Sequence, residues 1–130
     1  MNKESDMNIL DIVQSLDYTI RTKEIQKYKT SSDKCPYDIW LENLDKSVQA
    51  RIIKRIDRVS EGNFGDCKNI GSDISELRFD FGSGYRIYFS EFGNIVVILL
   101  CGGDKSTQAK DIEKAKEYVK DLKERLKNGN

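Results

Sequence analysis

Two arginines and a tyrosine stand in the segment from Glu76 to Gln108, where apolar and polar residues otherwise alternate. Arg78 belongs to the run ELRFDF, and Arg86 and Tyr88 belong to the run GYRIYF. A guanidinium presents several N–H donors in a planar fork that suits a phosphate group, and tyrosine adds a hydroxyl and a stacking ring. These residues predict an anion or phosphate site, although ordinary ion pairs on a solvated sheet face have the same sequence pattern.

The same segment ends in the sequence GGDKSTQ, residues 102–108. Lys105 stands just before Ser106 and Thr107, either of which can begin a helix, and the first N–H groups of a helix favour anions. The spacing is not that of a P-loop, G-x-x-x-x-G-K-[ST]. The segment therefore fits either a basic group at the edge of the anion site or a helix cap with a surface lysine.

Composition excludes several kinds of chemistry. The 130 residues include no histidine, which rules out the usual zinc sites and histidine-based acid–base catalysis. The three cysteines lack metal-ligand spacing, and an odd number does not suit a disulfide framework. Basic and acidic residues number 22 each, so net charge gives no direct argument for nucleic acid. We expect a reduced, cytoplasmic protein without metal or cofactor.

Alternating apolar residues predict two strands that carry these arginines. Residues 76–81 and 85–89 have a period of two, so each strand should present one apolar face. The apolar positions are Leu77, Phe79 and Phe81 in the first strand and Tyr85, Ile87 and Phe89 in the second. The run NIVVILLC, residues 94–101, is apolar at every position but its first and is expected to be a central, fully covered strand.

The length of the turn decides which residues the two strands place opposite each other. A two-residue turn at Gly82-Ser83 would put Arg86 opposite Phe79, on the apolar face. A three-residue loop, 82–84, would put Asp80 opposite Arg86 and keep the apolar residues together. We therefore expect a loop of odd length. The residues expected on the polar face are Arg78, Arg86 and Tyr88, with Asp80 and Glu76 nearby.

The rest of the chain predicts helices and one more strand around this sheet. The expected elements are an edge strand within 17–29, tandem helices at 37–44 and 48–59, a loop at 62–73 and a final helix at 107–126. Residues 1–16 are expected to form an N-terminal extension, helical or disordered, before one domain over 17–130. The order β-α-α-β-β-β-α segregates helices from strands and predicts an α+β two-layer sandwich with a mostly antiparallel sheet.

Four signatures, GNFGD, SELR, GYRIYF and GGDKSTQ-x-x-DI-x-x-A, occur in this order between about Tyr28 and Leu126. In this combination the chain resembles the addiction-module killer proteins, HigB-like toxins of the RelE/ParE superfamily. The resemblance implies a RelE-like fold and a toxin that cleaves mRNA on the translating ribosome and is silenced by a small antitoxin, often a helix-turn-helix protein. It also implies metal-independent cleavage, in which the ribose 2′-hydroxyl attacks the adjacent phosphate and expels the 5′-oxygen.

The resemblance further implies catalytic roles for individual residues. Arg86 matches the phosphate-stabilising arginine, Arg78 lies near a basic residue of the preceding strand, and Lys105 matches a basic residue after the last strand. Several relatives have a tyrosine or histidine where this chain has QAKDI, so either Tyr88 supplies the acid–base group from the sheet or that role is missing. Because unperturbed lysine, arginine and tyrosine have pKa values of about 10 or more, positioning and electrostatic stabilisation should dominate. The residues expected to bind RNA are Lys68, Gln108, Lys110, Arg51 and Lys54.

Two other functions fit the same resemblance. A ParE-like toxin would inhibit DNA gyrase through a protein surface, and a degenerate toxin would bind its antitoxin without cleaving RNA. For the ribonuclease, the expected partners are a cognate antitoxin, the ribosome and mRNA. No membrane is expected, because the longest apolar run, Ile95–Cys101, is too short to cross a bilayer.

Overall fold

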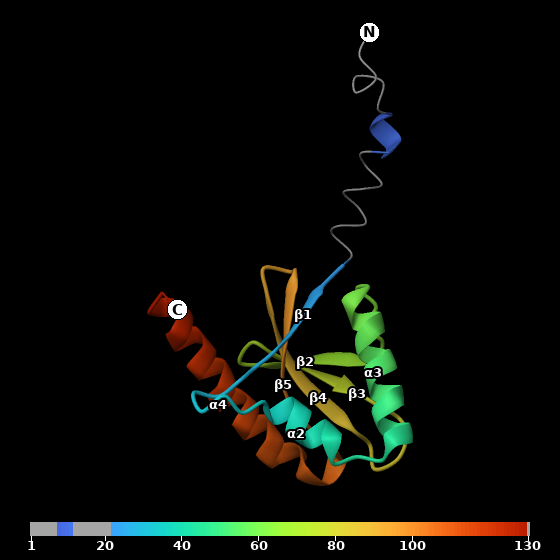
Figure 1. The fold of residues 1–130 in the computed structure, drawn as a ribbon, viewed down its shortest axis with the longest axis vertical. Helices are drawn as coiled ribbons and strands as arrows, with labels where there is room; N and C mark the ends of the chain where they lie inside the picture. Colours follow the sequence, from blue (N-terminus) through green and yellow to red (C-terminus); the bar gives the residue numbers. More distant parts are fainter. Residues whose placement is uncertain (1–7, 12–21, 130) are drawn as a thin grey trace.

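A five-stranded sheet carries the alternating segments in the computed structural model, which describes residues 8–11 and 22–129. The strands are β1 (Glu24–Lys27), β2 (Cys67–Gly71), β3 (Ile74–Arg78), β4 (Arg86–Phe92) and β5 (Val96–Gly103). They lie in the order β1-β5-β4-β3-β2, and only β1 and β5 run parallel (Figure 1). The mostly antiparallel sheet and the edge position of β1 are therefore confirmed, and β5 is an interior strand as its apolar sequence predicts.

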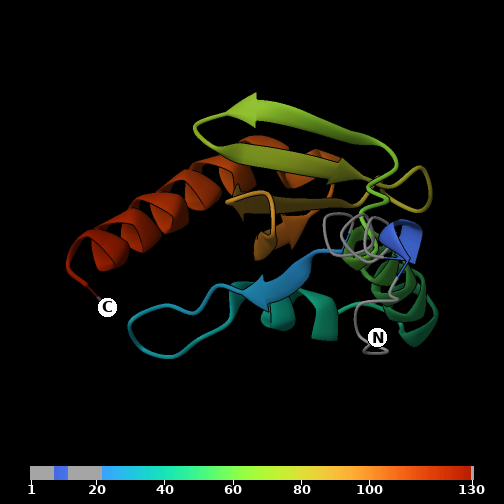
Figure 2. The ribbon, with the colours of Figure 1, turned by 90° about the horizontal axis from the view of Figure 1, so that it is seen from above.

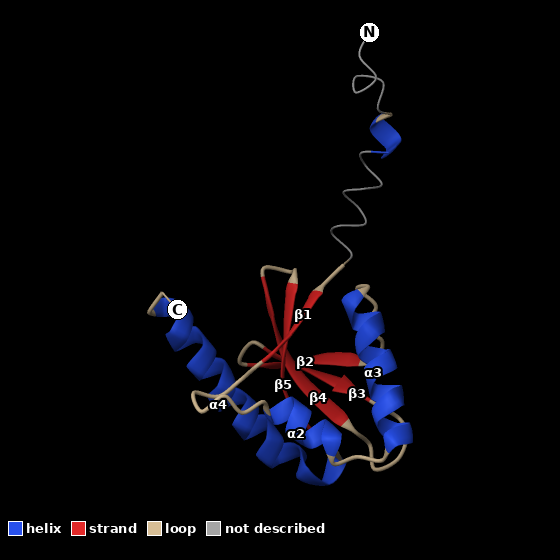
Figure 3. Cartoon of the chain, viewed as in Figure 1, coloured by secondary structure: helices blue, strands red, loops and turns tan. Residues whose placement is uncertain are grey.

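Helices cover both faces of this sheet. They are α2 (Pro36–Glu42), α3 (Lys46–Ser60) and α4 (Gln108–Lys127), with the 3₁₀ turn η2 (Lys105–Thr107) before α4. The helices α2 and α3 pack around Leu77, Ile87 and Phe89, whereas α4 packs over Tyr88 and Leu100. Figures 1 and 3 show α3 and α4 on opposite sides of the strands. The two-layer expectation is wrong, because β4 and β5 carry large apolar side chains on both faces.

The strand β2 is an addition to the predicted order, because its residues lie in the segment 62–73, whose sequence predicts a loop. It joins β3 through a tight turn in which Ser72 and Asp73 have φ of 54° and 62°. Such turns usually carry Asn-Gly or Asp-Gly, so this hairpin is hard to recognise in the sequence. In Figure 2 it forms the sheet edge farthest from β1. Its register places Lys68 opposite Glu76.

The register of β3 and β4 differs from the expected one by two residues. Arg86 lies opposite Arg78 and not opposite Asp80, and the Phe79 N–H donates to the Tyr85 carbonyl at 3.0 Å. The connecting loop, 80–84, is therefore of odd length, as predicted, but longer than three residues. A shift of two leaves every side chain on its predicted face. The pairing of Asp80 with Arg86 is nevertheless wrong, because the longer loop carries Asp80 out of the ladder.

Residues near the chain start are only partly described. Of the 1–16 extension the structure describes residues 8–11, where Ile9–Asp11 form a helical turn with exposed side chains. The other residues of the extension lie outside the described ranges, as do residues 17–21 of the expected edge strand. Within the described ranges, no helix combines the length and the apolar content needed to cross a membrane.

Gly102 is a point of close approach between β5 and α2. A Cβ added there would lie 2.2 Å from Cε3 of Trp40, whose ring also packs against Tyr37 and Tyr85. We expect Gly102→Ala to lower the free energy of unfolding by about 1–3 kcal/mol, because an overpacked ring must shift its neighbours. Urea denaturation measures the effect, with the exposed-site variant Lys120→Ala as control. Equal stability of the two variants would show that Trp40 moves freely.

Candidate active site

The carboxylate of Glu76 is the centre of a polar cluster between the sheet and α4. Glu76 is fully buried, and its Oε1 accepts a hydrogen bond from Arg78 Nε at 2.9 Å. Its Oε2 accepts one from Gln108 Nε2 at 2.7 Å. Nε of Arg86 lies 3.8 Å from Oε1, close enough for an ion pair but too far for a hydrogen bond. Two arginines directly opposite each other would repel, and Glu76 offsets that repulsion.

The charge state of Glu76 follows from these contacts. Burial alone would raise the pKa of the carboxyl, but the hydrogen bonds from Arg78 and Gln108 and the charge of Arg86 outweigh it, so the pKa is lowered. The neighbouring Tyr88 is also fully buried, and among the described residues no group lies within hydrogen-bond geometry of its hydroxyl. Burial, followed by the negative charge of Glu76, raises the pKa of Tyr88, so this hydroxyl stays protonated.

Arg86 and Lys105 meet at the loop between β3 and β4. A Cβ added at Gly84 would lie 3.4 Å from Lys105 Cβ and 3.9 Å from Arg86 Nη1. The Lys105 N–H also points to the Ser83 carbonyl, 3.4 Å away. Arg86 Nε is buried and unsatisfied among the described contacts, and the arginine side chain is 14% exposed against 34% for Arg78. The structure thus brings Arg78, Arg86 and the exposed Lys105 together.

Asp111, on the first turn of α4, adds a second carboxylate that the sequence does not single out. Its Oδ2 accepts a hydrogen bond from Thr107 Oγ1 at 2.5 Å and lies where a Cβ at Gly103 would fall, 1.8 Å away. Gly103 of β5 pairs with Arg86 of β4, so the Asp111 carboxylate lies over β5 at the position directly beside Arg86. Burial raises the pKa of Asp111, and the Thr107 hydrogen bond only partly opposes it. The sequence feature that could have indicated Asp111 is the pair Gly102-Gly103 followed by a helix with an aspartate in its first turn.

The residues expected to bind RNA separate into two groups. Lys68 is exposed on β2 opposite Glu76, so it shares the polar face, and Gln108 uses its amide to hold Glu76. Lys110 is exposed on α4 and lines a neighbouring pocket. Arg51 and Lys54 lie instead on α3, across the sheet from α4, and are not part of the Glu76 cluster.

Arg51 and Lys54 line a separate basic pocket of about 360 Å³. The Arg51 guanidinium lies 3.5 Å from the centre of the Phe81 ring. Asp80 lies in this pocket and not beside Arg86. Arg55, which also lines this pocket, donates hydrogen bonds to three backbone carbonyls, including that of Arg78 at 2.8 Å. These hydrogen bonds fix the end of β3. The sequence gives no signal for this role of Arg55, because it depends on contacts with carbonyls of distant segments.

A family model described as "Phage derived protein Gp49-like (DUF891)" matches residues 39–123. The match extends from α2 to α4 and includes every residue of the Glu76 cluster. The chain belongs to the Gp49-like family. An uncharacterized protein of Haemophilus influenzae is 49% identical over 87 residues, which cover 66% of this chain and 88% of that protein.

The Gp49-like family is a family of RelE-like toxins of toxin–antitoxin systems, and membership is compatible with a toxin that has an antitoxin partner. β1 and the first residues of α2 lie outside the matched region. All three catalytic arginine and lysine positions of the expected site lie inside it.

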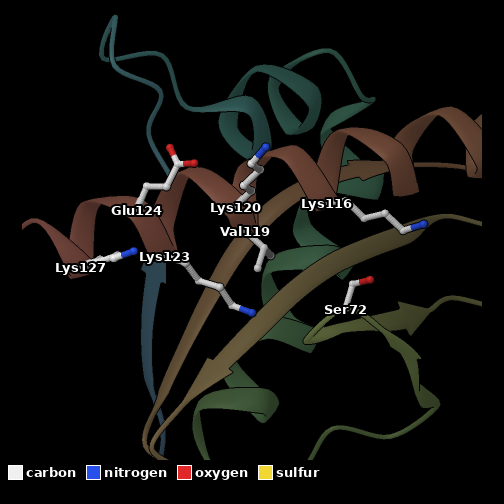
Figure 4. Close-up of a pocket in the computed structure, with 7 residues that line it drawn as sticks. All are labelled: Ser72, Lys116, Val119, Lys120, Lys123, Glu124 and Lys127. Atoms are coloured by element: carbon white, nitrogen blue, oxygen red, sulfur yellow. The ribbon is translucent and has the colours of Figure 1, made fainter.

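A larger pocket of this Gp49-like chain, about 450 Å³, lies between α4 and the β2–β3 turn. Figure 4 shows four lysines of α4 around Val119, with Ser72 on the strand side. Lys123 pairs with Asp73, and Lys116 lies 3.3 Å from Glu113. The described lining of this pocket contains lysines and Glu124 but no arginine for the planar recognition of a phosphate, so we place the candidate site at Glu76. Within the described ranges, no group of three or more acidic or cysteine side chains is placed to hold a metal ion.

Proposed function

We propose that this chain is the toxin of a toxin–antitoxin module and cleaves messenger RNA on the ribosome by a metal-independent reaction. The observation that carries the proposal is the pair of Arg78 and Arg86 on the Glu76 carboxylate, with Lys105 beside Arg86 at the loop between β3 and β4. Because two arginines share the single charge of Glu76, positive charge remains for a phosphate. Charge-bearing donors that are fixed before the substrate arrives are the groups that stabilise a phosphoryl transition state.

In the proposed reaction, the ribose 2′-oxygen bonds to phosphorus and the bond from phosphorus to the 5′-oxygen breaks. The products carry a 2′,3′-cyclic phosphate and a 5′-hydroxyl. We assign Arg86 to the phosphate oxygens, because its Nη1 lies 3.9 Å from the position of a Cβ at Gly84, beside Lys105, while its buried Nε faces Glu76. We assign Asp111 as the base that takes the 2′-proton and returns a proton to the 5′-oxygen. Its raised pKa suits that exchange better than an ordinary aspartate.

The remaining residues of the proposed site have supporting roles. Tyr88 is buried, so we assign it to the packing around Glu76 and not to contact with RNA. Gln108 and Arg78 orient the same carboxylate, while Lys68 extends the positive face toward β2. We propose that Arg51 and Lys54 contact RNA phosphates away from the reacting one, from the other side of the sheet.

The partners follow from this assignment. The family suggests an antitoxin, and we propose a small helix-turn-helix protein encoded beside this chain. Ribosome and message are the proposed substrate complex, and the cytoplasm is the proposed location. Because the net charge is zero, docking on ribosomal RNA would depend on local basic surfaces such as the α3 pocket and not on overall charge.

A second candidate is a non-catalytic module that binds the antitoxin alone. Two observations favour it: Glu76 already pairs with both arginines, and the buried Tyr88 hydroxyl cannot reach a substrate in this conformation. This candidate and a gyrase inhibitor make different predictions from the ribonuclease, and expression of the chain separates the three.

We expect induced expression without antitoxin to arrest growth and to produce cut messages with 5′-hydroxyl ends. Growth curves and mapping of message ends measure this, with co-expression of the protein encoded beside it as control. Arrest with intact messages and loss of DNA supercoiling would support the gyrase inhibitor. Normal growth together with a tight complex would support the non-catalytic module.

A further inference from the structure

A pocket of about 400 Å³ lies at the edge of β5, beside the Arg86 cluster. β1 pairs with β5 only along Val96–Leu99, so no described strand covers this side of Cys101–Gly103. α2 and α4 come together around this edge instead. The pocket has apolar walls and a basic rim. The walls include Ile39, Trp40 and Tyr118, and the rim includes Lys34, Lys110 and Lys114.

The walls of this pocket are flat and held in place. The Trp40 ring rests on Gly102, where even a Cβ would not fit. The Tyr118 ring stacks on Tyr28, with ring centres 4.7 Å apart and 26° between the planes. Ile39 is 50% exposed although it is apolar. Rigid aromatic walls with open apolar surface suit a planar ring, since base–aromatic stacking depends on such platforms.

The rim carries more positive than negative charge, because the described lining sets three lysines, Lys34, Lys110 and Lys114, against one carboxylate, Asp111, which the charges of Lys114 and Lys110 partly stabilise. Lys34, Lys110 and Lys114 form no ion pair with another described residue. The one carboxylate in the pocket, Asp111, accepts a hydrogen bond from Thr107 and lies against Gly103. An aromatic floor with a basic rim fits a ligand that is both planar and anionic, which is the chemistry of a nucleotide.

The position of the pocket relates it to the cleavage site. Its residue Gly102 pairs with Ile87, and the next residue of β5, Gly103, pairs with Arg86. Neighbouring strands lie roughly 5 Å apart, which is within the spacing of adjacent phosphates along an RNA chain. Resting on the proposed function, we propose that this pocket binds the nucleotide next to the cleaved bond, with its base against Trp40 and its phosphate between Lys110 and Lys114. The substrate would then be a single-stranded RNA segment.

The test uses Trp40 itself, because the chain contains one tryptophan. The probe is a pool of 2′-O-methyl RNA hexamers, which lack the attacking hydroxyl and stay intact. We expect saturable quenching of Trp40 emission in the full chain. The double variant Lys110→Glu/Lys114→Glu should weaken hexamer binding by roughly tenfold or more, because two favourable phosphate contacts become repulsive. Lys120→Glu/Lys127→Glu, the same charge change elsewhere on α4, should weaken it by less than about threefold.

The outcomes separate this pocket from the proposed function. Absent quenching, or equal weakening by both double variants, would overturn the pocket. So would adenosine monophosphate binding as tightly as the hexamers, which indicates a free-nucleotide site, or quenching by polyglutamate alone, which indicates an acidic protein segment. Quenching by hexamers in a chain that cuts no message would retain the pocket as an RNA site and remove the nuclease. Cleavage of message without quenching of Trp40 would retain the nuclease and overturn the pocket as an RNA site.

Discussion

Replacing Arg86 with alanine is expected to reduce message cleavage by about 100- to 1,000-fold and to abolish growth arrest. This is the effect of removing one fixed donor from a developing oxyanion. The structure supports a large effect because the Nε side of Arg86 is held beside Glu76 and its Nη1 lies at the loop beside Lys105. Single-turnover cleavage of a message in a translation extract measures it. Arg86→Lys keeps the charge but loses the planar fork, so it should recover only part of the rate.

The matched control is Arg125→Ala. Arg125 lies near the end of α4, where it pairs with Asp121 at 2.5 Å and packs over the Tyr28 ring. It is also a paired arginine, but it lies outside the Glu76 cluster, so its removal should leave cleavage within about threefold of wild type. Thermal melting checks that both variants are folded. Full toxicity of a folded Arg86→Ala variant would show that the phosphate is stabilised elsewhere.

Period-two alternation was sufficient to predict which residues share the face of the proposed site. Arg78, Arg86 and Tyr88 lie on one side of the sheet whether the loop has three residues or five, because a shift of two preserves the face. The pairing itself could not be predicted, since it depends on how Gly82 and Gly84, both at positive φ, shape the loop. Face assignment thus rests on local sequence, while register rests on turn geometry.

The burial of the sheet face that carries Arg86 could not be predicted from the sequence. The strand pattern alone leaves the Arg86 face open to solvent, but α4 folds back over it and buries Glu76 and Tyr88. The carboxylate therefore changes from a nearby surface charge to the centre of the cluster. Asp111 was missed for the same reason, because its relation to Arg86 exists only after α4 docks beside Gly103. Contacts between distant segments decide both roles.

Glu76→Gln is expected to lower the free energy of unfolding by about 3–5 kcal/mol at pH 7. The substitution keeps the shape of the side chain but removes its charge, and breaking a buried ion pair by removing one partner carries a cost of this size. Arg86 Nε would then be left buried with no counter-charge. Denaturant unfolding measures the loss. The control, Glu113→Gln, alters a side chain that is 71% exposed in its pair with Lys116 and should change stability by less than about 1 kcal/mol.

The pH dependence of this difference has a definite sign. The pKa of Glu76 is lowered in the folded chain, from an unfolded value of about 4.3. The stability that its charge supplies is therefore complete above about pH 4.3 and is lost as the pH falls through the lower folded pKa. The gap between wild type and Glu76→Gln should be constant near neutral pH and should narrow in acid. A gap that stays constant down to pH 3 would mean that the carboxylate acts through shape alone.

The same variant separates charge from positioning at the proposed site. Removing one negative charge leaves Arg78 and Arg86 more attractive to RNA, so hexamer binding should tighten if charge alone governs the site. Cleavage should nevertheless fall, because the carboxylate that orients Arg78, and lies 3.8 Å from Arg86, is gone. Tighter binding with slower cleavage would identify Glu76 as a positioning residue. Tighter binding with faster cleavage would show that Glu76 only competes with the phosphate for the arginines.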